Sequence, residues 1–333
     1  MHRRQWLKLL SGAGIGAASG ARPAAFRFRP QRGRIQVLRD SKPYTAFYYG
    51  PEWDRPFLHP IVTPSGTEVS RGVPPKAGED SDRPWQRGLW YGHGDTGGWD
   101  FWGERVDEST GKKMNGRMVV PDPPAADAKA AAITARAELI TAGGEALGSL
   151  TERFRFSGGE RWNVIDVAVS ISANRGDLIL GDCAEGGLAV RLTEEFRDDR
   201  GVDVINSEGV TGVETWGKPA RWVDYSARLF GRMAGVAILD HPGNLRYPTR
   251  WNAQDDGLVS ANPFGTGSFK NPNGNGEQTE GRWTIRQGSA LALFYRVVIH
   301  EGSAEEAGID AMHAEFAKEA ATALSPQTAQ EDR

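Results

Sequence analysis

The chain has 333 residues, and its 40 basic and 43 acidic residues give a formal net charge of −3. This balance, without a long run of lysine or arginine, argues against a nucleic-acid binder. Cys183 is the only cysteine, so no intrachain disulfide can form, and the chain is long enough for a core that needs none. Eleven tryptophans are many for this length, and their flat amphipathic rings suit pockets as well as cores.

The first 25 residues have the three regions of an export signal. Arg3 and Arg4 precede a short, mildly apolar stretch at 9–18, and the small residues of "ARPAA" follow. An arginine pair followed by an aromatic residue and leucine is typical of the twin-arginine signal, so we expect a periplasmic or secreted protein whose mature chain starts near Phe26. A membrane anchor is disfavoured because glycine and serine interrupt the apolar stretch. The alternative is a cytosolic basic N-terminus with an accidental arginine pair.

Short segments with β character follow, separated by Gly, Pro, Asn and Asp. Residues 129–141 would be helical by propensity, but they also alternate with the period of two that strands show. The clearest signal is a hairpin in which two alternating runs flank Gly158 and Gly159. The other segments expected to form strands are 34–40, 44–50, 187–192, 232–239, 282–288 and 291–302.

Only the C-terminal segment predicts a helix, with Ser303 as its cap and acidic residues in its first turn. The side chains that share one face of this helix are Ile309, Met312, His313 and Phe316. Many short strands with almost no internal helix predict an all-β fold, a large antiparallel β-sandwich with a C-terminal helix. We expect one domain over 26–324 and a disordered tail over 325–333.

The run "RGLWYGHGDTGGWDFWGE" (87–104) concentrates aromatic and acidic residues around a histidine. Glycines on both sides of His93 allow the backbone to turn sharply or to approach another group closely. We interpret His93 as a catalytic acid or base that Asp95 orients, and Arg87 as a residue that binds substrate hydroxyls. The alternative is a strand and a glycine-rich turn whose tryptophans fill the core.

A second run, "GDCAEGGLAVRL" (181–192), offers another titrating group. Glu185 is a candidate catalytic acid or base, because proton transfer at a sugar carbon needs a donor and an acceptor on opposite sides. Arg191 on the following strand is a candidate to bind a carboxylate or a hydroxyl group. The alternative is a surface turn followed by a salt-bridged arginine.

A third run, "DHPGNLRYPTRWN" (240–252), reads as a loop with many hydrogen-bond donors, such as would face a carbohydrate. His241 is a further candidate catalytic residue in this run, and the alternative is an ordinary solvated connection. Trp251 is expected to stack on a sugar face. The residues expected to bind substrate here and just beyond are Asn244, Arg246, Trp251 and Asn262.

Several familiar motifs are absent from the sequence. There is no dinucleotide-binding or P-loop glycine motif, no G-x-S-x-G and no H-E-x-x-H. With one cysteine and scattered histidines, the chain shows no closely spaced metal motif, and the sequence assigns no cofactor. We expect His59 and His300 to be structural.

The runs quoted above, together with "ARWVDYSA" and "GLVSANPFG", resemble the bacterial PmoA family, which is often labelled methane oxygenase-like. The resemblance implies an exported protein of polysaccharide-degrading bacteria with a sandwich of the galactose-mutarotase type. It also implies an exported sugar oxidoreductase as a partner. The sequence departs from that family, because "DRPWQRGL" stands in place of "DHPHHRGL", and Tyr247 and Asn252 replace histidines. If those histidines bind metal or move protons in the relatives, this protein has changed its specificity or lost activity.

The label itself conflicts with the composition. A methane monooxygenase subunit consists of long apolar membrane spans, whereas this chain has a mean hydropathy of −0.50, so we exclude that activity. The leading hypothesis is an exported carbohydrate-active enzyme, an epimerase, lyase or hydrolase that acts on sugars or oxidised glycosides. The rivals are a noncatalytic glycan-binding module and a structural partner of an exported oxidoreductase.

Overall fold

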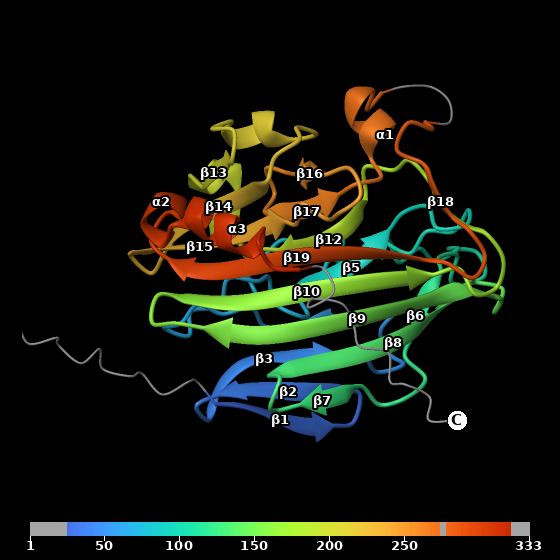
Figure 1. The fold of residues 1–333 in the computed structure, drawn as a ribbon, viewed down its shortest axis with the longest axis horizontal. Helices are drawn as coiled ribbons and strands as arrows, with labels where there is room; N and C mark the ends of the chain where they lie inside the picture. Colours follow the sequence, from blue (N-terminus) through green and yellow to red (C-terminus); the bar gives the residue numbers. More distant parts are fainter. Residues whose placement is uncertain (1–24, 274–277, 321–333) are drawn as a thin grey trace, which may run out of the picture.

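The computed structural model describes residues 25–273 and 278–320, so the predicted export signal and disordered tail lie outside the described residues. Two broad antiparallel sheets face each other (Figure 1). In the order in which they pair, the strands of the eight-stranded sheet are β1 (Phe26–Gln31), β2 (Arg34–Arg39), β3 (Lys42–Tyr48), β4 (Phe57–Leu58), β5 (Leu89–His93), β12 (Gly186–Arg191), β17 (Leu258–Asn262) and β16 (Arg250–Ala253).

The second sheet has nine strands, most of them longer. In pairing order they are β13 (Asp203–Asn206), β14 (Trp222–Leu229), β15 (Arg232–Asp240), β19 (Ala290–Glu301), β10 (Trp162–Ser172), β9 (Ala146–Gly158), β8 (Ala132–Ile140) and β6 (Arg117–Val119), with β7 (Ala125–Asp127) beside β8. A separate ribbon joins β11 (Leu178–Leu180) to β18 (Trp283–Ile285). The predicted large antiparallel β-sandwich is confirmed.

The core lies between the two sheets, and the alternation of β9 and β10 shows why. Phe154 and Phe156 on β9 point into the same apolar cluster as Val167 on β10, while the intervening residues face outward. Glu152 breaks this pattern. It pairs with Ala135 and Val169, both core residues, and it is only 2% exposed. Its carboxyl group makes no hydrogen bond or ion pair with a described residue.

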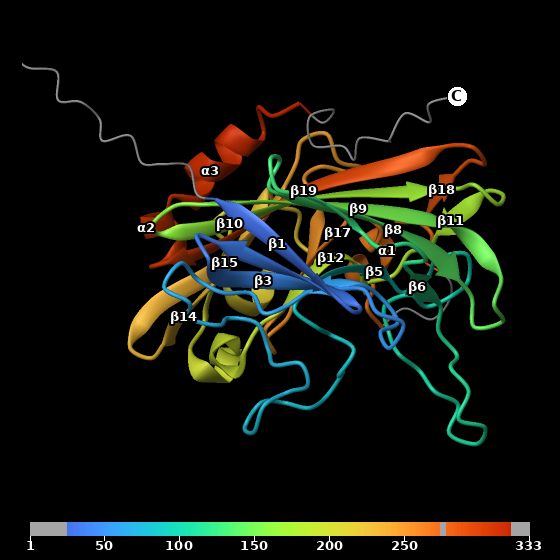
Figure 2. The same ribbon diagram turned by 90° about the horizontal axis from the view of Figure 1, so that it is seen from below.

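Two short helices pack on the outer face of the nine-stranded sheet (Figure 2). They are α2 (Ala304–Ala307), which Ser303 caps through a capping box with Glu306, and α3 (Ile309–Phe316). Gly308 lies between them at φ 72°, a left-handed conformation that favours glycine and divides the single helix expected from the sequence. Ile309 and Phe316 bury their side chains against this sheet.

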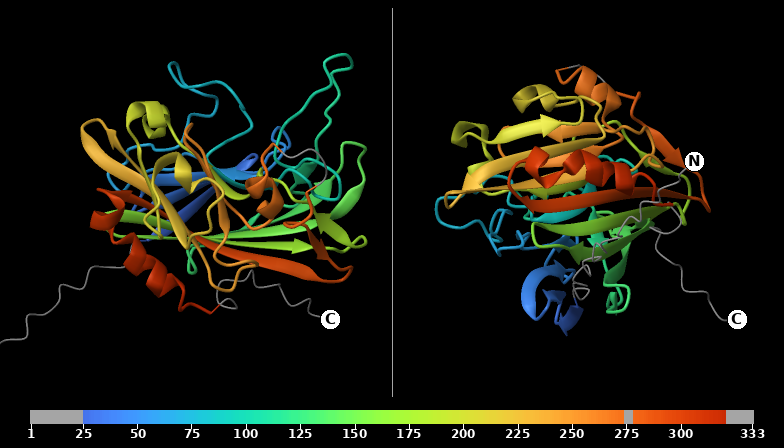
Figure 3. Two further views of the ribbon diagram at one scale, coloured as in Figure 1. Left: turned by 90° about the horizontal axis from the view of Figure 1, so that it is seen from above. Right: turned by 60° about the vertical axis from the view of Figure 1, so that its left-hand side comes forward.

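The outer face of the eight-stranded sheet carries the long connections instead. Figure 3 (left) shows the loops that follow β4 and β5 projecting from this side, opposite the red C-terminal helices. Short 3-10 turns at Glu194–Phe196, Asp198–Arg200 and Gly212–Thr215, and helix α1 (Thr266–Lys270), complete the connections. None of the described helices is long and apolar enough to cross a membrane.

A second apolar cluster holds these connections on the sheet. Trp90 on β5 contacts Trp102 from the following loop with ring centroids 5.2 Å apart, and both are buried together with Phe57, Ala189 and Leu258. The loops are therefore packed on the sheet, and they bring polar side chains to fixed places above it.

The structure also corrects the sequence-based elements. Within residues 129–141, strand β8 (Ala132–Ile140) forms instead of a helix, as their period of two indicated. The run 240–252, expected to be a loop, ends in strand β16, which pairs with β17 and forms the edge of the sheet. Strands β1 and β14 were not predicted. The short segment "RWNA" alternates polar and apolar residues but contains no run of apolar ones. It is therefore a strand because it pairs with β17, and not because of its own pattern.

Candidate functional site

The candidate site lies where the loop before β12 meets the loop after β5. We define the Glu185 site as the segment 182–186 together with Asp100, Arg83 and Trp216. Glu185 is partly buried, and its carboxyl group makes no hydrogen bond or ion pair with a described residue. The charged groups that act on it are, in order of effect, those of Asp100, Arg105, Arg83 and Arg55.

The backbone around Glu185 is held firmly. Its carbonyl oxygen accepts a hydrogen bond from Gly94 N at 2.8 Å. The carbonyl of Ala184 accepts from the side chains of Asn252 at 3.1 Å and Asn262 at 3.0 Å. Since three bonds from two strands and a loop fix this segment, the Glu185 side chain leaves the backbone in a defined direction.

Only glycine fits at position 94. A Cβ atom there would come within 2.7 Å of Cys183 Sγ and 3.7 Å of Glu185 Cβ, so both side chains lie over Gly94. Burial, and to a smaller extent the negative charge of Glu185, raise the pKa of the Cys183 thiol to about 11. Cys183 is therefore a neutral thiol at pH 7 and not a nucleophile.

The surroundings of Glu185 favour the protonated form of its carboxyl group more than water does. Burial raises the pKa of its carboxyl group above the usual value, and the charge of Asp100 raises it further, while Arg105, Arg83 and Arg55 lower it. Asp100 itself is fixed, because its Oδ1 accepts hydrogen bonds from Trp102 N at 2.7 Å and Gly103 N at 2.8 Å. A partly exposed carboxyl group with a raised pKa can act as a general acid or base.

Two arginines, the fully buried Arg191 and the partly exposed Arg83, share one carboxylate of the protein. Arg191 is fully buried, and its Nη1 donates to Gln86 Oε1 at 2.9 Å and Asp256 Oδ2 at 2.6 Å. Arg83 Nη1 donates to the same Asp256 oxygen at 2.7 Å. Of the two interpretations of Arg191, the structure shows the salt-bridged arginine, because the carboxylate that it binds belongs to the protein. The Nε2 of Gln86 has no hydrogen-bond partner among the described residues.

An indole ring stands beside the segment. Trp216 is partly exposed, its Nε1 donates to Asn252 Oδ1 at 3.1 Å, and its ring meets Phe269 edge to face at 5.1 Å. Asn252 in turn donates to Ala184, so the ring and Glu185 are fixed through one side chain. Sequence reasoning missed Trp216, because nothing near it in the sequence indicates this contact.

His93 does not reach this site. It is 1% exposed, and Nε2 lies 2.9 Å from the Gly181 carbonyl oxygen, which fixes the ring. Nδ1 faces Gly186, where a Cβ atom would come within 2.3 Å, and has no hydrogen-bond partner among the described residues. Burial lowers the pKa of His93 to about 4, so the ring is neutral at pH 7. A substrate has no path to it in this conformation.

Asp95 does not orient the imidazole of His93 as we expected. Its Oδ1 accepts a hydrogen bond from Gly98 N at 3.0 Å and closes a local turn. Its Oδ2 lies over Gly181, where a Cβ atom would come within 1.8 Å. The Gly181 carbonyl, rather than a carboxylate, therefore holds the ring.

His241 lies in a different part of the molecule. It follows β15 of the nine-stranded sheet, and its ring packs edge to face on Phe316 of α3 at 5.0 Å. Nε2 lies 3.0 Å from the Glu319 carbonyl oxygen, and Nδ1 accepts from Gly243 N at 3.0 Å. These partners assign the neutral tautomer with the proton on Nε2. The structure does not bring His241 to His93, so these two candidate catalytic residues do not share a site.

The other predicted substrate-binding residues have structural partners. Arg87 binds Glu104 through two hydrogen bonds, of 2.5 and 3.0 Å, and Asn244 links Asp240 Oδ1 to the Phe294 backbone, each at 2.7 Å. Arg246 donates to the carbonyl oxygens of Pro263 at 2.8 Å and Gly281 at 3.0 Å. These bonds tie loops together and leave few donors for a ligand.

Trp251 cannot stack on a sugar as we expected. It lies in the core with 0% exposure, and its Nε1 donates to the Ala220 carbonyl at 2.9 Å. The reason is the position of β16, where alternation turns Trp251 toward the other sheet and Asn252 toward the outer face. Asn262 does lie at the Glu185 site, where it positions the 183–184 backbone.

Comparison with protein-family models identifies the family of the chain. The model of DUF6807, described as a family of unknown function, matches residues 34–314. The chain belongs to the DUF6807 family. The resemblance to the PmoA family was wrong, because the family model that matches is DUF6807 and not PmoA. A comparison of this DUF6807 protein with curated proteins gave no match.

Solved structures similar to the DUF6807 protein include two galactose mutarotase-like proteins. The galactose mutarotase related enzyme from Lactobacillus acidophilus has a TM-score of 0.35 at 9% identity, over 84% of this chain and 97% of that chain. The galactose mutarotase-like protein from Clostridium acetobutylicum has 0.40 at 11%, over 84% and 99%. The GH36 alpha-galactosidase AgaB from Geobacillus stearothermophilus has 0.40 at 13%, over 84% of this chain and 41% of that chain. These similarities concern the fold, and not the residues or the activity of this protein.

Proposed function

We propose that this DUF6807 protein acts on a carbohydrate by acid/base chemistry, with Glu185 as the group that donates or accepts the proton. The observation that carries the proposal is the Glu185 carboxyl group, which is partly buried, has no partner among the described residues and lies on a backbone segment that three hydrogen bonds hold in place. Because this carboxyl group is also partly exposed, another molecule can reach it and complete its hydrogen bonds.

The surroundings of Glu185 support a sugar as the substrate. Trp216 offers a partly exposed indole face, which suits the apolar side of a sugar ring. Arg83, whose side chain is 37% exposed, is a donor toward hydroxyl groups at the same site. Asp100 is the second carboxyl group near Glu185, and a pair of carboxyl groups can supply the acid and the base for chemistry on a sugar.

The test is turnover by the chain from Phe26 onward on a panel of glycosides and 3-keto-glycosides, with products identified by mass spectrometry. Glu185→Gln keeps the size and hydrogen-bonding capacity of the side chain but cannot transfer the proton, so we expect turnover to fall by at least about 100-fold. Glu195→Gln, which changes an exposed acidic residue that makes no ion pair with a described residue, is the matched control and should leave turnover unchanged. Equal turnover by wild type and Glu185→Gln would refute the proposal.

A second candidate function is a noncatalytic glycan-binding module. It is favoured by the two histidines, His93 and His241, whose rings are held by backbone carbonyl oxygens instead of facing a substrate. For this function the panel should yield no product, while Glu185→Gln should change only the affinity for a bound glycan.

Export is part of the proposal, and the arginine pair at the start of the sequence supports it. We expect the protein in the periplasmic or secreted fraction, and we expect replacement of Arg3 and Arg4 by lysine to retain it in the cytoplasm. Fractionation followed by detection of the protein tests this. The expected oxidoreductase partner depended on the PmoA resemblance, so it is not carried forward.

A further inference from the structure

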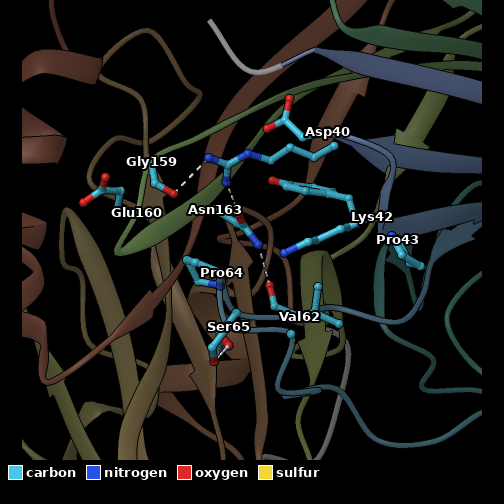
Figure 4. Close-up of a pocket in the computed structure, with 13 residues that line it drawn as sticks. Asp40, Lys42, Pro43, Val62, Pro64, Ser65, Gly159, Glu160 and Asn163 are labelled. Atoms are coloured by element: carbon cyan, nitrogen blue, oxygen red, sulfur yellow. Dashed lines mark hydrogen bonds between the residues drawn. The ribbon is translucent and has the colours of Figure 1, made fainter. Parts of the chain in front are cut away.

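A cavity of about 510 Å³ opens where three turns meet, away from the Glu185 site (Figure 4). Its walls are the β2–β3 turn, the loop 62–66 and the β9–β10 turn. None of its lining residues belongs to the Glu185 site. Cavities of this volume bind molecules the size of a small metabolite.

The walls are tied together by one chain of hydrogen bonds. Arg39 Nη1 donates to Asn163 Oδ1 at 2.8 Å, and Arg39 Nη2 donates to the Gly159 carbonyl at 3.0 Å. Asn163 Nδ2 then donates to the Val62 carbonyl at 2.9 Å. Because Asn163 is buried and links all three walls, the cavity keeps its shape without a ligand.

Two cations face each other across the end of the β2–β3 hairpin. Arg39 and Lys42 are directly opposite in the register, and the two turn residues between them, Asp40 and Ser41, both have positive φ values. Side chains at directly opposed positions lie on the same face of a sheet, and like charges there repel. In Figure 4 the amine of Lys42 extends toward Asn163, into the cavity.

In the part of the chain that the structure describes, neither Arg39 nor Lys42 has an acidic partner. Arg39 uses its guanidinium for neutral oxygens only, and Lys42 makes no hydrogen bond or ion pair with a described residue. The acidic lining residues, Asp40 and Glu160, are exposed and pair with neither cation. The opposed pair therefore has no direct ion-pair partner among the described residues, although two carboxylates line the same cavity.

We infer that this cavity is a binding site for a monosaccharide-sized anion of the sugar-acid class. Arg39 and Lys42 bind the carboxylate, which compensates their charge. Asp40 and Glu160 accept hydrogen bonds from ring hydroxyl groups at the rim, where both side chains are exposed. A neutral sugar has the hydroxyl groups but not the carboxylate, so the site discriminates against it.

Isothermal titration calorimetry with D-glucuronate, and with D-glucose as the neutral probe of the same size, tests the inference. Glucuronate should bind at least about tenfold more tightly than glucose, and Lys42→Ala should weaken glucuronate binding about tenfold. Lys129→Ala removes the same charge from an exposed turn elsewhere and should change the affinity less than about twofold. Equal affinity for the two sugars, or no measurable glucuronate binding, overturns the inference.

A further variant separates this site from the proposed catalytic one. Glu185→Gln should bind glucuronate with the affinity of the wild type, whatever its effect on turnover. If Glu185→Gln weakens glucuronate binding and Lys42→Ala does not, the sugar acid binds at the Glu185 site and the cavity is not its site. Lys42 is exposed and has no hydrogen-bond or ion-pair partner among the described residues, so its replacement tests binding without disturbing the fold.

Discussion

The burial of Glu152 makes the free energy of unfolding depend on pH, and the structure determines the sign of this dependence. Burial raises the pKa of its carboxyl group from 4.5 to about 8, because the side chain lies in the core between Ala135 and Val169 without a partner. Between these two values the folded protein holds a proton on Glu152 that the unfolded chain releases. The free energy of unfolding therefore falls as the pH rises from 4.5 to about 8.

The size of this effect follows from the interval between the two pKa values. Each pKa unit corresponds to 1.36 kcal/mol, so the loss reaches about 5 kcal/mol at most. That is a large share of the stability of an ordinary domain. Below pH 4.5 and above pH 8 the contribution of Glu152 no longer changes with pH.

Glu152→Gln is the perturbation that isolates the effect, because it keeps the size of the side chain and removes the titration. Urea denaturation of both proteins from pH 4 to pH 9 gives the difference in the free energy of unfolding. We expect the two proteins to agree within about 1 kcal/mol near pH 4.5, and the variant to be the more stable by up to about 5 kcal/mol at pH 9. Asp240, whose pKa burial raises to about 7, titrates in both proteins and cancels in the difference. A difference that stays constant with pH would refute the reasoning.

Three other variants test the assignments made above. Trp251→Ala should lower the free energy of unfolding by about 3–5 kcal/mol in urea, because the ring fills the core. An unchanged free energy of unfolding would show that the ring does not fill the core, and the expectation that it stacks on a sugar would stand again. His241→Ala should cost about 1–3 kcal/mol in the same assay and leave turnover per folded molecule unchanged, whereas a loss of turnover would contradict its structural role. Gly94→Ala brings a methyl group within 2.7 Å of the thiol beside Glu185, so turnover should fall at least about tenfold, while Gly143→Ala, which makes only ordinary contacts, should not change it.

The sequence predicted the long strands well and the short ones poorly, for a physical reason. Strands β9 and β10 are 13 and 11 residues long, and alternate apolar residues of both strands, among them Phe154, Phe156 and Val167, face the core between the sheets, so pattern and pairing agree. Strand β16 has four residues, and a charged and an amide side chain flank its tryptophan. Only the pairing with β17 makes it a strand, and a single sequence does not show that pairing.

The candidate site was predictable to the extent that its residues are neighbours in the sequence. Glu185 was identified from its own run, but its contacts with Asn252 and Trp216 join segments that lie far apart in the chain. His93 and Asp95 failed as a pair because the backbone turns between them, so that one side chain enters the core and the other closes a turn. The sequence showed which residue types occur close together in the chain, but it did not show the directions in which their side chains point.

The two outer faces of the sandwich differ in how their polar groups are used, and this difference locates the chemistry. On the nine-stranded sheet, the helices leave His241 and His313 bonded to backbone carbonyl oxygens, and Arg296 bonded to Asp166 and Glu319. On the eight-stranded sheet, the loops pair their arginines with carboxylates but leave Glu185 without a partner among the described residues. Glu152 also lacks a partner there but is sealed in the core, whereas Glu185 is partly exposed, so a ligand can reach it and supply the missing hydrogen bond. The face that carries Glu185 is therefore the one on which a substrate should be sought.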